Sequence, residues 1–145
     1  MPGERPYTDS VVVTQTVRAV VPFVVTYGLF TMLHGTKSVG GGFQGGVVVA
    51  SGVVTLAFAF GVTQTLAALA PGVLRAVAAG GLLLFAAVAA ASLALGGAFL
   101  DAGTYARLPV TGAAVYAVEL VEIGIGLTVA SVISLAFFTL ARAEP

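Results

Sequence analysis

The run AVAAGGLLLFAAVAAASLALGGAFL, residues 76–100, contains no Asp, Glu, Lys or Arg. An α-helix needs about 20 consecutive apolar residues to cross the hydrocarbon core of a bilayer. The run exceeds that length, and its side chains are apolar on every side. A strand of a membrane β-barrel would instead alternate apolar and polar residues over about ten positions. Residues 76–100 therefore predict a transmembrane helix and an all-α fold.

Other parts of the chain repeat this pattern. The further runs without a charged side chain are 19–36, 38–74 and 123–141. At about 20 residues per crossing, we expect four transmembrane helices, at about 11–33, 46–69, 74–99 and 112–141. Pro71 and Gly72 predict a turn between the second and third helices. The sequence thus predicts a single polytopic membrane domain over residues 1–145.

The composition excludes several classes of function. Of the 145 residues, 59% are hydrophobic and 8% are charged, against about a quarter charged in soluble domains. The net charge is zero, so the chain offers no basic patch for nucleic acid. With no cysteine and one histidine we expect no metal site. We see no nucleophile–base pair either, so we expect neither an enzyme nor a cofactor.

A glycine-rich segment, HGTKSVGGGFQGG at residues 34–46, stands out from the apolar background. Glycine lets the backbone take positive φ angles or approach a neighbouring helix closely. A phosphate-binding loop would need a preceding strand and a following Gly-Lys-Ser/Thr, which are missing. We expect an ordered structural motif with an apolar anchor at Phe43, formed by Gly35, Gly40, Gly41, Gly42, Phe43, Gly45 and Gly46.

Two acidic residues, Glu119 and Glu122, lie inside the fourth predicted helix. On a helix that starts near Thr111, they lie roughly 12 and 16 Å from its start. This is close to the midplane of a core about 30 Å thick. Their spacing of three places both on one helix face. A carboxylate at this depth costs several kcal/mol unless it is paired, hydrated or protonated. Both are candidates for an ion path, Glu122 more than Glu119 because it lies deeper; a structural bond to another subunit is the alternative.

His34 is the third candidate for the ion path, at the predicted end of the first helix. Its side chain titrates near neutral pH without help, although a histidine in this place also serves simply to interact with the helix dipole. The distribution of basic residues predicts the orientation. Four arginines (Arg5, Arg18, Arg75 and Arg142) share the side of the termini, against Lys37 and Arg107 on the other side, which favours cytoplasmic termini.

The first helix and the glycine segment together resemble a known family. The stretches that carry the resemblance are Tyr27-Gly28-Leu29-Phe30, Leu33-His34-Gly35 and Gly40-Gly41-Gly42-Phe43-Gln44-Gly45-Gly46. They resemble the B subunit of Mrp-type multisubunit cation/proton antiporters. The resemblance implies a small subunit in the cell membrane whose partners are large antiporter-like subunits and other small membrane subunits. It also implies Na⁺, or another monovalent cation, and H⁺ as the transported ions.

Three functions remain open at this point. The chain contributes to the cation path of an antiporter, or it holds larger subunits together without conducting. Alternatively, it is a membrane-arm subunit of an energy-converting hydrogenase or a related complex I-like redox complex, because related subunits occur there. The buried acidic residues and the glycine signature favour the first function. The small number of charges favours the purely structural one.

Overall fold

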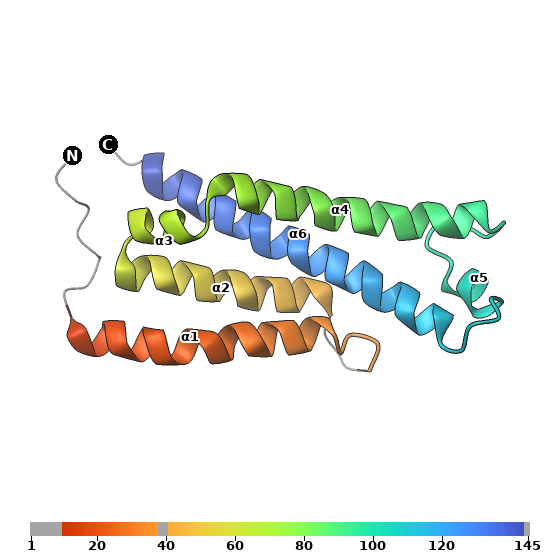
Figure 1. Ribbon diagram of the computed structural model, residues 1–145, viewed down its shortest axis with the longest axis horizontal. Coiled ribbons are helices and arrows are strands. Elements are labelled where there is room, and N and C mark those ends of the chain that lie inside the picture. Colours follow the sequence, from red (N-terminus) through yellow and green to blue (C-terminus); the bar gives the residue numbers. More distant parts are fainter. Residues whose placement is uncertain (1–9, 38–40, 144–145) are drawn as a thin grey trace.

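The computed structural model describes residues 10–37 and 41–143, and all the regular structure in these ranges is helical (Figure 1). The predicted all-α fold is confirmed. Four of the described helices are long and apolar enough to cross a membrane. The elements are α1 (Val11–Met32), α2 (Gly42–Phe60), α3 (Val62–Ala68), α4 (Pro71–Ala94), α5 (Ala102–Ala106) and α6 (Ala113–Ala143).

The helix starts follow from local chemistry. The Ser10 side chain accepts a hydrogen bond from the backbone N–H of Val13 and so caps α1. Pro22 lies within α1 without ending it, and the hydroxyl of Thr26 donates to the Pro22 carbonyl at 2.7 Å. At α5, the Asp101 carboxylate accepts from the Gly103 N–H at 2.9 Å and the Thr104 hydroxyl at 2.6 Å. These hydrogen bonds hold the pKa of the Asp101 carboxyl below its usual range, and the bond from the Thr104 hydroxyl has a larger effect than the bond from the Gly103 N–H.

The second predicted helix differs from the structure at both ends. The range 46–69 was expected as one helix, but α2 begins at Gly42 and the chain breaks at Gly61 before α3. Gly61 has φ +93° and ψ 148°, a conformation open essentially only to glycine. The turn predicted at Pro71 and Gly72 is also wrong. Pro71 begins α4, where the first backbone N–H groups have no partner within the helix, so a proline loses no hydrogen bond there. The connection between α3 and α4 lies at residues 69–70.

The four long helices lie side by side in one layer, in the order α1, α2, α6, α4 (Figure 1). α6 packs against α2 on one side and against α4 on the other, while α1 packs against α2. With 31 residues, α6 is longer than the roughly 30 Å core requires, and a helix of that length tilts. It crosses the layer diagonally in Figure 1.

Pairs of glycines lie at the three helix crossings of the layer. They are Gly28 with Gly45 (α1 and α2), Gly46 with Gly126 (α2 and α6), and Gly81 with Gly124 (α4 and α6). A Cβ atom added to Gly81 would lie 2.6 Å from the Gly124 carbonyl oxygen, and one added to Gly124 would lie 2.7 Å from the Gly81 carbonyl oxygen. Small residues allow membrane helices to approach this closely, so that backbone packs against backbone.

An apolar cluster stabilises the layer around the break between α2 and α3. Phe138 of α6 is 2% exposed and lies at its centre. The buried residues that pack with it come from α2, α3 and α4: Ala57, Val62, Leu66 and Leu74. The glycine crossings and this cluster hold α6, which carries Glu119 and Glu122, against α2 and α4.

Candidate functional site

Glu122 lies where the segment after α1 and the start of α2 approach α6. A Cβ atom added to Gly35 would overlap the Glu122 carboxylate, and one added to Gly41 would lie 2.9 Å from Glu122 Oε1. A Cβ atom on Gly42 would overlap the backbone carbonyl of Glu122. The glycine segment and the acidic residue, which the sequence treats as separate features, therefore form one site.

The polar groups of this site are incompletely paired. Among the described residues, Oε2 of Glu122 is buried without a hydrogen-bond partner, and the same is true of Oγ1 of Thr36. The backbone N–H of Gly35 acts on the carboxylate as a hydrogen-bond donor. An unsatisfied buried polar group costs about 1–3 kcal/mol, and more when it is charged. Such a site is stabilised by a proton, a water molecule or a cation on the carboxylate.

Glu119 lies one helical turn before Glu122. It is half-buried, and its charge acts on the Glu122 carboxylate. Because α6 begins at Ala113, a rise of 1.5 Å per residue places Glu122 about 14 Å along the helix. The two carboxylates are thus neighbours within the membrane-spanning part of α6, with Glu122 the one enclosed by the glycine segment.

His34 follows α1 and is exposed to solvent. Its ring stacks on Phe30 with the two ring centroids 4.1 Å apart. Its neighbour in the chain, Gly35, contacts the Glu122 carboxylate. The structure therefore brings Glu122 and Gly35 together and places His34 on the surface beside them.

The rest of the glycine motif has a different form from the one predicted. Gly42 and Gly45, which were expected to precede the second helix, belong to α2 together with Gly46. They are buried because neighbouring helices approach them, Gly45 against Gly28 and Gly46 against Gly126. Close approach is their role, and no positive φ angle is required there. Gly40 lies outside the described residues.

Phe43 was predicted as an apolar anchor and is 63% exposed. It lies at the edge of an open groove of about 290 Å³ between α1 and α2. Tyr27, Thr31, Gln44, Val47 and Val48 line the groove with it. Within this chain, Phe43 points outward to the groove.

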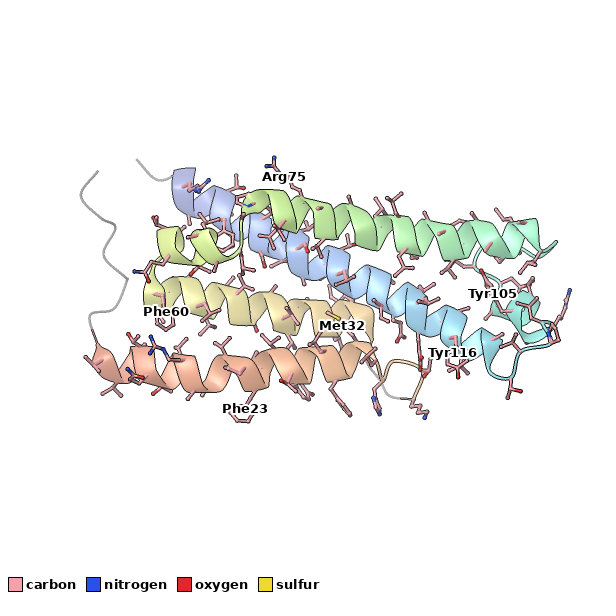
Figure 2. The ribbon with its side chains drawn as sticks, in the orientation of Figure 1. Phe23, Met32, Phe60, Arg75, Tyr105 and Tyr116 are labelled. Carbon is pink, nitrogen blue, oxygen red and sulfur yellow. The ribbon has the colours of Figure 1, made fainter. Side chains whose placement is uncertain are left out.

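Sequence reasoning missed Met32 beside this site and the buried hydroxyl of Thr36, the residue that follows Gly35. Met32, labelled in Figure 2, is 4% exposed. A Cβ atom on Gly45 or Gly126 would come within 2.5 or 2.7 Å of its side chain, so Met32 fills the junction of α1, α2 and α6. Thr36 carried no signal of its own, because only the fold shows that its hydroxyl is buried, without a partner among the described residues.

The face of α6 that carries Glu119 and Glu122 is only partly buried. Gly126 packs against α2 and Met32, whereas Val115 is 44% exposed and Gly112 is exposed, with φ +81° before the helix. Gly96, after the end of α4, has φ +81° and no neighbouring atom within 4 Å of an added Cβ. Its role is to turn the chain after α4.

The sequence is similar to those of known proteins. Residues 12–135 match a family model described as a domain related to the MnhB subunit of Na⁺/H⁺ antiporter. A protein of Staphylococcus saprophyticus named "Putative antiporter subunit mnhB2" is 36% identical over 125 residues, covering 84% of this chain and 88% of the relative. A protein of the same name from Staphylococcus haemolyticus is 33% identical with the same coverage.

Proposed function

The chain belongs to the MnhB family and is a small integral-membrane subunit of an Mrp-type Na⁺/H⁺ antiporter, and we propose that Glu122 takes part in its ion path. The observation that carries this proposal is the close contact of the carboxylate with Gly35 and Gly41, with one buried oxygen that has no hydrogen-bond partner among the described residues. Ionisable residues inside membrane helices commonly mark ion pathways and proton relays. Here the carboxylate binds a proton or a monovalent cation and releases it again.

Thr36 supplies the second polar group of this site. Thr36 directly follows Gly35 in the chain, and its hydroxyl oxygen is buried. The backbone N–H of Gly35 acts on the Glu122 carboxylate. A hydroxyl can donate to a carboxylate when the site is empty and offer its oxygen when a cation is bound. Glu119 lies on the same face of α6 one turn away and passes the ion toward or away from Glu122.

A structural role for the same residues is the second candidate. The backbone carbonyl of Glu122 is in contact with Gly42 whatever the charge of the side chain. In that case, the carboxylate serves only to hold the segment after α1 against α6. The hydrogenase-type alternative is not favoured, because the family model and both relatives carry antiporter names. The same names agree with a transporter subunit rather than an enzyme.

Glu122→Gln separates the two candidates. The amide keeps the size and the hydrogen-bonding capacity but cannot ionise. Assembled complex and antiport are measured in the same membrane vesicles. For an ion-path residue we expect normal assembly with antiport lowered at least about tenfold, the effect of roughly 1.4 kcal/mol. Glu122→Asp retains part of the activity, and Thr36→Val lowers it while Thr36→Ser does not.

Glu119→Gln is the matched comparison, because it makes the same chemical change one turn away. We expect a smaller loss of antiport than for Glu122→Gln. Low complex yield with normal transport per complex supports the structural candidate. Full assembly with unchanged antiport at every working pH contradicts both the ion-path role and the structural role of Glu122.

We also propose the partners of the chain and its orientation in the membrane. Large antiporter-like subunits and other small membrane subunits surround the chain in the plasma membrane, with Na⁺ and H⁺ as the transported ions. The excess of arginine at the end that carries the start of α1 and the end of α6 supports cytoplasmic termini. Since the chain has no cysteine, a single Lys37→Cys should react with a membrane-impermeant maleimide from outside the cell. Arg75→Cys should react only after permeabilisation, and the reverse pattern contradicts this orientation.

A further inference from the structure

An open groove of about 400 Å³ lies beside the break between α2 and α3. Leu56 and Phe60 of α2 line it together with Gln64, Thr65, Ala68 and Leu69. The groove exists because Gly61 redirects the chain, so that the short α3 does not continue the line of α2. Its surface is mostly apolar, with Gln64 exposed at its edge.

A cation lies next to this groove. The guanidinium carbon of Arg18 is 5.5 Å from the centroid of the ring of Phe60, the residue labelled in Figure 2. Phe60 also lines the groove. Arg18 is exposed, and among the described residues it is the one charged side chain of α1. An aromatic ring under the guanidinium limits its motion and leaves its N–H groups free to bind an anion.

The charges of the described residues at this end of the layer are all positive. Arg18 near the start of α1, Arg75 near the start of α4 and Arg142 near the end of α6 lie there (Figure 1). The described acidic residues are elsewhere: Asp101 precedes α5 at the opposite end, and Glu119 and Glu122 lie in the first half of α6. The described part of this end therefore offers only cationic side chains to a ligand, which favours an anionic one.

We propose that the groove binds an anionic phospholipid. One acyl chain lies along Leu56, Phe60 and Ala68, and the phosphate accepts hydrogen bonds from Arg18 and Gln64. Arginine at the level of the lipid headgroups pairs well with phosphate, and basic pockets between membrane helices are known to bind such headgroups. The Thr65 hydroxyl donates to the Gly61 carbonyl at 3.0 Å, so it stabilises the break and is not the phosphate ligand.

Photolabelling of the assembled antiporter complex in membranes tests this site. The probe is a phosphatidylglycerol with a diazirine in the acyl chain, compared with a phosphatidylcholine carrying the same chain. After illumination the tagged subunit is purified under denaturing conditions, and the labelled residues are identified by mass spectrometry. We expect labelling of residues 56–69, stronger with phosphatidylglycerol, and about fivefold weaker in Arg18→Gln.

Two variants serve as controls. Arg107→Gln removes the same charge at the opposite end of the layer and should leave the labelling unchanged. Arg18→Lys keeps a positive charge and should retain most of the labelling. Complex yield is measured for every variant. Equal labelling by both lipids, or full labelling of Arg18→Gln, overturns the proposal. So does an assembled complex without label at residues 56–69, since another subunit then covers the groove.

Discussion

At the scale of single residues, Gly35 and Glu122 depend on each other. A Cβ atom on Gly35 would overlap the carboxylate. Gly35→Ala must therefore displace the Glu122 side chain or the segment after α1, at a cost of about 1–3 kcal/mol for overpacking. We expect reduced antiport, with a smaller reduction in assembled complex. Both are measured in the same vesicles, as for Glu122→Gln.

Gly72→Ala is the control for this substitution, because no atom lies within 4 Å of a Cβ added there. It should assemble and transport as the unchanged protein does. If Gly35→Ala also behaves normally, the carboxylate has room to move, and the enclosed site is not needed for transport.

At the scale of the elements, the glycine pairs determine how close the helices come. Gly81 of α4 faces the Gly124 carbonyl of α6, whereas the adjacent Gly80 has no atom within 4 Å of an added Cβ. Gly81→Ala should push α4 from α6 and lower the stability by about 1–3 kcal/mol. Gly80→Ala should be neutral or slightly stabilising, because alanine favours the helix.

The thermal midpoint of the purified complex in detergent measures this difference. The two variants add the same methyl group at adjacent positions, so a lower midpoint for Gly81→Ala alone assigns the effect to the crossing. Equal midpoints for both variants contradict the importance of this crossing.

At the scale of the whole molecule, the four long helices form a layer with two broad faces. Large apolar side chains are exposed along it, such as Phe23, Leu83 and Leu140 at 77%, 69% and 72%. Lipid or neighbouring subunits cover these faces in a membrane. A single layer also lacks a closed path through its interior, so the chain expressed alone in vesicles should show no cation-dependent proton movement.

The assembled complex in matched vesicles is the positive control for that measurement. Robust antiport by the isolated chain would contradict the subunit function and would require a path built by several copies of this chain.

The membrane helices were predictable from the sequence because about 20 uncharged apolar residues have no other stable arrangement in a bilayer. The same holds for the glutamates on one face of α6, since helix periodicity is local. Only the tertiary structure shows that Glu122 lies beneath Gly35, that the Thr36 hydroxyl oxygen is buried, and that Gly81 meets Gly124. These contacts join residues far apart in the chain, and nothing in local propensity or periodicity encodes which faces of two helices meet. The break at Gly61 belongs to the same class, because a lone glycine in an apolar run is compatible with a continuous helix until neighbouring packing selects its positive φ.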